Sequence, residues 1–257
     1  EKIRVLITND DGFKSGNIQA LARALASVAL VYVFAPESEQ SGVGQAFTVR
    51  RGLKVEKICE MGEDAPYSMY SVSGTPADCA KFAIGHFAKE LDIEFDLCFS
   101  GVNVGENAGV SSLYSGTVAG AREAALWGVP SVALSLHGIH GDMLEDSLEF
   151  AKHVVTEGLY RHIAPHTFWN VNFPKNKYGA IKGYRSAKMA LDMFTDHYSH
   201  ADGLWQLDGE KPWQNAADGT DDSLLHQGYV TITPHRVDQT DFESLKIIDE
   251  LMKVKEG

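Results

Sequence analysis

The stretch Ile3-Arg4-Val5-Leu6-Ile7-Thr8-Asn9-Asp10-Asp11-Gly12 decides how the rest of the chain is interpreted. A short apolar, β-branched run stops at two adjacent carboxylates and a glycine, which is typical of a buried strand of a parallel sheet followed by a turn. Ligands of open α/β sheets bind at the carboxyl ends of the strands. Two adjacent acids there would repel each other unless a cation lies between them, and hard divalent cations prefer oxygen ligands. The stretch therefore indicates a metal site, with a solvated or helix-capping turn as the simpler alternative.

Composition limits the function classes. The chain has 257 residues and a net charge of −12, from 23 basic and 35 acidic residues. This length suits one large α/β domain or two small ones. The negative charge argues against broad binding of a nucleic-acid polymer but allows a small phosphate substrate. Three widely spaced cysteines favour a reducing cytoplasm over a disulfide framework. No apolar run is long enough to span a membrane and no secretory leader is visible, so we expect a cytoplasmic protein.

After the first strand, segments with the hydrophobic spacing of helices alternate with short apolar runs typical of strands. Helical spacing predicts helices over residues 17–27, 75–89, 115–127, 143–160 and 242–254, and short apolar runs predict strands over 28–34, 67–72, 95–100, 131–136, 168–174 and 228–234. Residues 46–55 alternate in polarity, which predicts antiparallel strands at an edge. The order predicts a mostly parallel, doubly wound sheet. The character of the chain becomes polar at Lys175, so we divide it into a core over 1–174 and a C-terminal extension over 175–257.

Helix starts carry two further signals. Thr75 is a plausible N-cap, with Pro76 at the first helical position and Asp78 in the first turn, so we interpret Asp78 as a structural cap. Ser115, Gly116 and Thr117 open the next helix with hydroxyls and free N–H groups, which is an arrangement suited to phosphate. The alternative at this second helix is close packing on the sheet through glycine and alanine, and both can hold together.

Oxygen ligands are expected from three loops at one sheet edge, contributed by Asp10 and Asp11, by Ser41, and by Asn103. Such a set suits Mg²⁺ or Mn²⁺, with water and a substrate phosphate completing the coordination. A cation there could lower the pKa of bound water and neutralise developing charge. Taken alone, Ser41 and Asn103 are also compatible with ordinary loop chemistry. Together the residues predict a metal-assisted phosphomonoester hydrolase.

The sequence contains other possible metal and catalytic sites, each with weaker signals than this one. Asp196-His197, His200 and Asp202 could form a metal cluster, as could His137 with His140, although surface positions are the simpler interpretation for both groups. A serine hydrolase needs G-x-S-x-G, and Leu113 replaces a required glycine around both Ser111 and Ser115. No P-loop motif occurs, and Gly42-x-Gly44 is too short for a dinucleotide fingerprint.

Several motifs of the chain, in the same order, resemble the survival protein E (SurE) family of metal-dependent nucleoside-monophosphate phosphatases. The segments that carry this resemblance are Thr8-Asn9-Asp10-Asp11-Gly12, Ala35-Pro36 with Gln40-Ser41-Gly42, Ser73-Gly74-Thr75-Pro76-Ala77-Asp78-Cys79, Ser100-Gly101-Val102-Asn103 with Gly105 and Asn107, Tyr114-Ser115-Gly116-Thr117-Val118-Ala119-Gly120-Ala121, Asn170-Val171-Asn172-Phe173-Pro174, Gly219-Thr220-Asp221 and Gly228-Tyr229-Val230-Thr231-Ile232-Thr233-Pro234.

The resemblance implies a single-domain, three-layer α/β/α sandwich with a Rossmann-like sheet and a C-terminal arm that exchanges between the subunits of a homodimer or homotetramer. It implies hydrolysis of nucleoside 5′- or 3′-monophosphates, with polyphosphate as a further substrate, and a role in stationary-phase survival. One divalent cation per subunit would lie on Asp10, Asp11, Ser41 and Asn103, with Asp11 also orienting or deprotonating the attacking water. The residues expected to bind phosphate or substrate are Asn9, Gly42, Asn107, Ser115, Gly116 and Thr117.

The resemblance is weakest over residues 186–213, where Thr195-Asp196-His197-Tyr198-Ser199-His200 replaces a basic turn common among relatives. The non-enzymatic alternative for the chain is a nucleotide-binding regulator that uses the same pocket.

Overall fold

The structure, a computed structural model, describes residues 2–62, 65–138, 143–175, 180–212 and 216–253. Its helices are α1 (Gly16–Ala26), α2 (Pro76–Phe82), η1 (Ala83–Phe87), α3 (Ala88–Glu90), α4 (Ser111–Tyr114), α5 (Gly116–Leu126), α6 (Leu144–Thr156), η2 (Leu159–His162), α7 (Asp221–His226) and α8 (Phe242–Lys253). Its strands are β1 (Arg4–Thr8), β2 (Leu30–Pro36), β3 (Val55–Cys59), β4 (Ser68–Val72), β5 (Leu97–Val104), β6 (Ser131–Leu136), β7 (Thr167–Phe173), β8 (Tyr184–Ser186), β9 (His197–Ala201), β10 (Leu204–Asp208) and β11 (Val230–Arg236).

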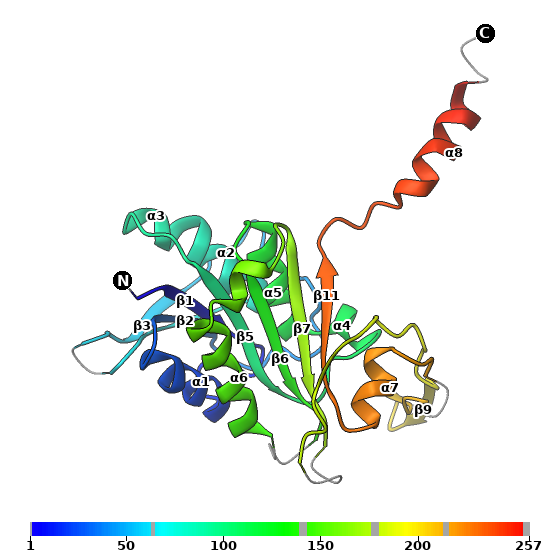
Figure 1. The fold of residues 1–257 in the computed structure, drawn as a ribbon, viewed down its shortest axis with the longest axis horizontal. Helices are drawn as coiled ribbons and strands as arrows, with labels where there is room; N and C mark the ends of the chain where they lie inside the picture. Colours follow the sequence, from blue (N-terminus) through cyan, green and yellow to red (C-terminus); the bar gives the residue numbers. More distant parts are fainter. Residues whose placement is uncertain (1, 63–64, 139–142, 176–179, 213–215, 254–257) are drawn as a thin grey trace.

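A central sheet joins nine strands of the described chain in the order β3-β4-β2-β1-β5-β6-β7-β11-β8. From β4 to β7 every neighbouring pair runs parallel, whereas β3 and β11 run antiparallel to β4 and β7. Helices cover both faces (Figure 1). The predicted α/β fold, a three-layer sandwich around a mostly parallel sheet, is confirmed.

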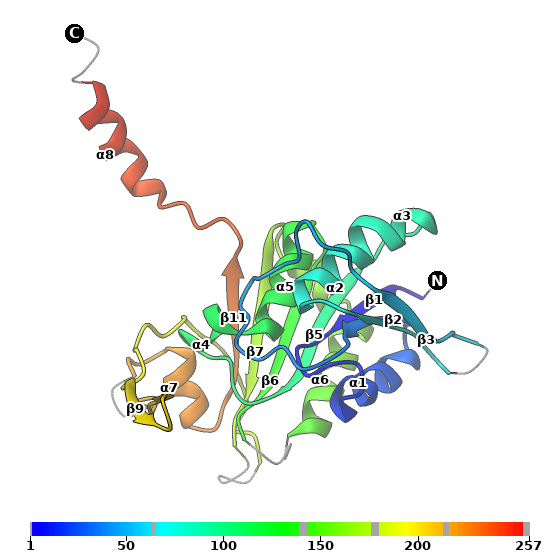
Figure 2. The ribbon, with the colours of Figure 1, turned by 180° about the vertical axis from the view of Figure 1, so that it is seen from behind.

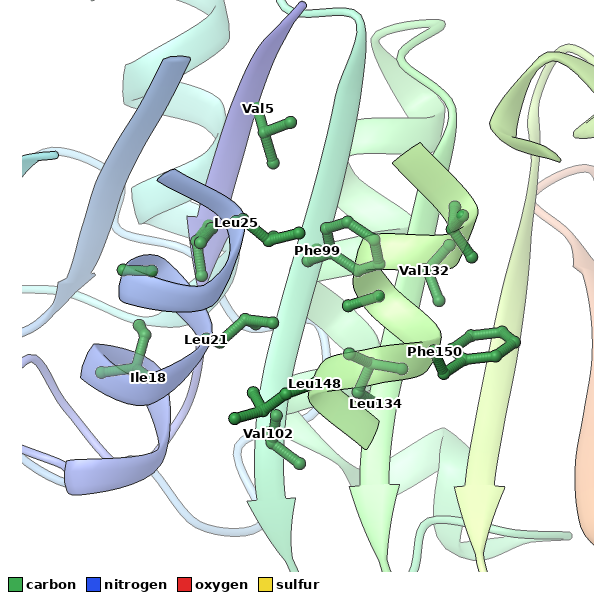
Figure 3. Packing of buried hydrophobic residues seen from close by; sticks show 14 of the residues in the cluster. Val5, Ile18, Leu21, Leu25, Phe99, Val102, Val132, Leu134, Leu148 and Phe150 are labelled. Atoms are coloured by element: carbon green, nitrogen blue, oxygen red, sulfur yellow. The ribbon is translucent and has the colours of Figure 1, made fainter. Parts of the chain in front are cut away.

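The two faces of the sheet bury alternate residues of each strand. Val5 and Ile7 of β1 pack with α1 and α6, whereas Leu6 packs on the opposite face with residues of α2 and α5. Figure 3 shows the first of these layers, in which Leu21 of α1 and Leu148 of α6 lie over Phe99 and its neighbours. This alternation fixes the face to which every side chain of a strand points.

Chain order around β1 creates the crevice of a doubly wound sheet. The chain leaves β1 through α1 to β2 on one side, and later places β5 on the other side of β1 before continuing through α5 to β6. The point where strand order reverses therefore lies between β1 and β5. Loops diverge there at the carboxyl ends, and ligands of such sheets bind at this position.

Three sequence predictions need correction. The antiparallel edge structure predicted over 46–55 exists only as β3, which begins at Val55 and pairs with β4. Earlier residues of that range form no strand, and Ala46 and Thr48 bond to side chains at the start of α2. The strand predicted over 95–100 is shifted and longer, because β5 begins at Leu97 and continues to Val104. The helix predicted over 143–160 ends at Thr156, where Gly158 in a left-handed conformation (φ 66°) separates it from η2.

The C-terminal segment, residues 175–257, contributes to the main sheet as well as extending away from it. β11 pairs with β7, and β8 follows β11, so residues beyond 174 supply two strands of the main sheet. β9 and β10 form a separate hairpin. Helix α8 projects away from the body in both views (Figures 1 and 2). The predicted end of this helix, Val254, lies outside the described residues. None of the described helices is both long and apolar enough to cross a bilayer.

Candidate active site

A cavity of about 370 Å³ lies at the carboxyl edge of the sheet, where strand order reverses. It brings together seven of the residues that the sequence predicts for the site: Asp10, Asp11, Ser41, Gly42, Asn103, Asn107 and Ser115. Its other lining residues are Glu39, Val104, Gly105, Glu106, Ser111, Tyr114 and Phe194. Glu39 could have been found from its place two residues before Ser41, whereas no sequence signal pointed to Phe194.

Asp10 is held by the first turn of α5. The backbone N–H of Thr117 donates to Asp10 Oδ2 at 3.0 Å, and the Thr117 hydroxyl donates to Asp10 Oδ1 at 2.6 Å. A Cβ atom on Gly116 would lie 2.9 Å from Asp10 Cβ, so only glycine allows this approach. Gly116 and Thr117, predicted to bind phosphate, therefore contact the Asp10 side chain and do not line the cavity.

Asp11 is the less satisfied of the two acids. Burial, followed by the charges of Asp10 and Glu39, raises the pKa of Asp11 to about 6. Burial also raises the pKa of Asp10, against the lowering effect of its bonds to Thr117. Within the described residues the Asp11 Oδ2 atom is buried and has no hydrogen-bond partner. Such a group requires a partner that the protein itself does not supply.

Ser41 and Asn103 offer further oxygens. The Ser41 hydroxyl donates to Glu39 Oε1 at 2.6 Å, which leaves its oxygen lone pairs for a ligand. Asn103 Nδ2 donates to the carbonyl of Gly105 at 2.8 Å, so Asn103 Oδ1 is the amide atom that can bind a cation. Asn103 lies where the pairing of β5 with β6 shifts register after Ser100, at the end of the strand.

Two buried carboxylates tether the loop that carries Ser41. Asp78 accepts the N–H of Thr48 at 2.7 Å and its hydroxyl at 2.8 Å. Glu123 accepts the amide of Gln45 at 2.9 Å. Asp78 also forms a capping box with Thr75, so the predicted capping role is confirmed. The same side chain therefore caps α2 and positions the Ser41 loop.

The part of the cavity predicted to bind phosphate is formed by the residue that caps α5 and by the loop that carries Asn107. Ser115 caps α5 by accepting the N–H of Val118 at 3.1 Å, and its own hydroxyl hydrogen can donate to a bound group. Asn107 makes three hydrogen bonds to β6 and β7, each at 2.8 Å. Its N–H donates to Asn172 Oδ1, its Nδ2 donates to the Ser135 hydroxyl, and its carbonyl accepts a bond from Asn170 Nδ2. Asn170 and Asn172 share a face because they are two residues apart on β7.

Asn9 does not line the cavity. Its Nδ2 donates to the Gly12 carbonyl at 3.0 Å and its Oδ1 accepts the Gly12 N–H at 3.2 Å, so it closes the turn that carries both acids. Within this segment Asn9 therefore stabilises the turn, whereas Asp10 and Asp11 line the cavity and are the candidate ligands.

The donor set fits a hard divalent cation. Asp10 and Asp11 supply carboxylates, Ser41 and Asn103 supply neutral oxygens, and the partnerless Asp11 Oδ2 lies among them. Among the described residues, the candidate site included, no group of three or more His, Cys, Asp or Glu side chains could hold a metal ion, so the site depends on two carboxylates together with Ser41 and Asn103. The residues proposed around His197 lie on the exposed hairpin. His140, the partner proposed for His137, lies outside the described residues.

A larger hollow of about 650 Å³ lies at the amino ends of β5 and β6, between Phe95 and Trp127. It is lined by residues that precede these strands and by the end of the α2–η1–α3 helix. It is on the wrong edge of the sheet for a Rossmann-type ligand site, so the smaller, carboxylate-lined cavity is the stronger candidate.

Comparison with known proteins agrees with this geometry. The family model for survival protein SurE matches residues 5–196. The 5′-nucleotidase SurE of Brevibacillus brevis is 37% identical over 98% of this chain and 97% of its own length. The chain belongs to the SurE family.

Other SurE proteins extend the likeness along the whole chain. The 5′-nucleotidase SurE of Thermosipho africanus is 37% identical over 96% of this chain and 97% of its own length. The crystal structure of the SurE protein from Aquifex aeolicus superposes with a TM-score of 0.82 at 33% identity, covering 97% of this chain and 99% of the other. The SurE motif segments around Asp10, Ser41, Asn103 and Ser115 are the segments that meet at the cavity.

Proposed function

We propose that this SurE protein is a divalent-metal-dependent 5′-nucleotidase that hydrolyses nucleoside monophosphates to nucleoside and phosphate in the cytoplasm. The observation that carries the proposal is the single cavity in which Asp10, Asp11, Ser41 and Asn103 meet, in a chain whose relatives are named 5′-nucleotidases. The cytoplasmic location is supported by the small number and wide spacing of the cysteines, three in 257 residues, which suit a reducing compartment. Hydrolysis of 3′-monophosphates and of short polyphosphate is proposed as a further activity of the same site.

Each residue of the site has a separate role in the proposed hydrolysis. A divalent cation on the four ligands would offset phosphoryl charge and lower the pKa of a water molecule. Asp10, fixed by Thr117, holds its carboxylate in one orientation. Asp11 orients the attacking water and accepts its proton, while the departing nucleoside oxygen gains a proton from solvent. The Ser115 hydroxyl at the α5 N-terminus donates to the phosphate.

Phosphate release tests the proposal. The purified protein is assayed on AMP, GMP and IMP, on the corresponding 3′-monophosphates and on polyphosphate, after EDTA treatment and with Mg²⁺, Mn²⁺ or Zn²⁺ restored. We expect turnover only with metal, and a fall of at least about 100-fold in Asp11→Asn. Calorimetric titration of the metal should show weakened binding in the same variant.

Two results would contradict the proposal. A folded Asp11→Asn variant with wild-type metal-dependent turnover would remove Asp11 from the mechanism. Nucleotide binding without hydrolysis under every metal would instead favour a nucleotide-binding regulator.

We also propose that the protein assembles as a homodimer or homotetramer through its C-terminal arm. Helix α8 leaves the body and exposes its apolar side chains, which supports a role in contact with another subunit.

A further inference from the structure

The cavity has two chemically different parts. Carboxylates, Ser41 and Asn103 make one part suited to a cation and a phosphate. Tyr114 and Phe194 are the two aromatic side chains that line it within the described residues. A nucleoside monophosphate has the same two parts, an anionic phosphate and a flat aromatic base. The base therefore needs a surface in this cavity that the metal ligands do not provide.

Phe194 is placed at the cavity by the neck of the β9–β10 hairpin. Beside it, the Thr195 N–H donates to the Glu210 carbonyl at 2.9 Å, and the Glu210 N–H donates back to the Thr195 hydroxyl at 3.2 Å. These bonds join the two chain segments at the point where Phe194 and Lys211 lie next to each other. The ring belongs to none of the three apolar clusters of the described chain, so it is not there to fill a core.

Lys211 fixes the ring against the active-site loop. Its Nζ atom lies 5.7 Å from the centre of the Phe194 ring. The same buried ammonium bonds Asp222 Oδ1 at 2.7 Å and the Ala108 carbonyl at 2.8 Å, and lies 3.3 Å from Glu106 Oε1. A cation anchored by this many oxygens cannot move freely, so the aromatic ring that contacts it is held in place.

We infer that Phe194 is the residue on which the base of a nucleoside monophosphate stacks, and that Lys211 is the positioning residue that keeps this ring at the cavity. The inference rests on the proposed nucleotidase function. It adds the residue that makes the enzyme prefer nucleotides as substrates. Stacking is tolerant of sequence because every base has an aromatic face, so Phe194 selects nucleotides over other phosphate esters and discriminates little among bases.

The experiment compares two substrates that share a sugar phosphate, AMP and ribose 5-phosphate, with Mn²⁺ present. Phe194→Ala should raise KM for AMP by about tenfold with kcat nearly unchanged, because stacking is lost before the chemistry is affected. Its kinetics on ribose 5-phosphate should match those of the wild-type protein. Phe194→Trp should retain AMP preference, whereas Phe194→Leu, apolar but without an aromatic face, should lose it. The matched control is Trp205→Ala, which removes an exposed aromatic of the same hairpin outside the cavity.

Each outcome decides a separate point. Equal losses on both substrates in Phe194→Ala, or no change on either, overturn the inference while the nucleotidase function stands. A wild-type protein that releases phosphate from neither substrate overturns the proposed function and this inference with it. Should circular dichroism show that Phe194→Ala is unfolded, the Leu and Trp variants give the same comparison, and equal AMP preference in those two overturns the inference.

Discussion

At the scale of single residues, Asp10 depends on a partner 107 positions away in the sequence. The hydroxyl and N–H of Thr117 engage both of its carboxylate oxygens, and Gly116 leaves the space for this approach. The helix N-terminus predicted to hold phosphate thus largely orients Asp10, which we propose as a metal ligand. Ser115 remains as the residue of this segment that lines the cavity.

Thr117→Val tests this orientation. The variant keeps the backbone bond and the side-chain volume but loses the hydroxyl that donates to Asp10 Oδ1. We expect a loss of about 10–100-fold in metal affinity or turnover, as is usual when a partner of a metal ligand is removed. Thr117→Ser, which keeps the hydroxyl, should stay close to wild type. Equal activity of the Val and Ser variants would show that the hydroxyl has no part in orienting Asp10.

At the scale of elements, buried carboxylates connect segments that the sheet alone would leave apart. Asp78 joins α2 to the Ser41 loop. Asp221, at the start of α7, accepts the N–H groups of Gly109 and Ala190 at 2.8 and 2.9 Å. It therefore joins the loop between β5 and α4, which contributes residues to the cavity, to the C-terminal segment. The Gly219-Thr220-Asp221 motif therefore has a supporting role that its sequence did not reveal.

Asp78→Ala should lower the free energy of unfolding by about 1–3 kcal/mol, because the carboxylate half of the α2 capping box is lost and the Thr48 and Thr75 N–H groups lose their acceptor. Urea unfolding measures this change. Metal affinity should fall as well, since the Ser41 loop is released. Thr48→Val, which removes only one donor, is the control and should lose less; a larger loss in that variant would place the main effect outside the Asp78 carboxylate.

Lys211→Met should destabilise the protein by about 3–5 kcal/mol near pH 8, because Glu106 and Asp222 would remain buried without their cation. In the wild-type protein burial raises the pKa of Asp222 to about 6, against the lowering effect of Lys211. The folded state therefore holds this proton more tightly than the unfolded chain, and stability falls as the pH rises from 3.8 to about 6.

Loss of Lys211 should raise the pKa of Asp222 further, so the destabilisation of Lys211→Met should shrink as the pH is lowered toward 5. Urea unfolding of both proteins at pH 5 and pH 8 checks the sign. If the unfolding free energy of Lys211→Met is lower than that of the wild-type protein by the same amount at both pH values, lost packing and not unpaired charge is responsible.

At the scale of the whole molecule, α8 is an amphipathic helix whose apolar side chains no other described part of the chain covers. Its apolar side chains, including Leu245, Ile248 and Met252, lie at helical spacing and are roughly half exposed or more. Both views place the helix away from the sheet (Figures 1 and 2). An isolated helix of this length is marginal in water, which supports the proposal that another subunit covers it.

Light scattering after size-exclusion chromatography tests the arm. The wild-type protein should elute as a dimer or tetramer, and Leu245→Asp combined with Ile248→Asp should reduce the mass by at least one assembly step, because charges on the apolar stripe oppose its burial. A Glu243→Gln variant leaves the stripe intact and should assemble normally. A monomeric wild-type protein, or an unchanged double variant, would exclude α8 as the contact.

The sequence by itself determined most of the central sheet and the group of proposed metal ligands, since strand periodicity, turn residues and capping residues are local signals. It placed Asp10, Asp11, Ser41 and Asn103 at strand ends, and chain order then brought these ends together. Tertiary structure alone decided that Thr117 holds Asp10, that β11 joins the main sheet, and that Phe194 reaches the cavity with Lys211 against its ring. These contacts join residues that are distant in sequence and depend on the path of the chain in space, which no local pattern of side chains encodes.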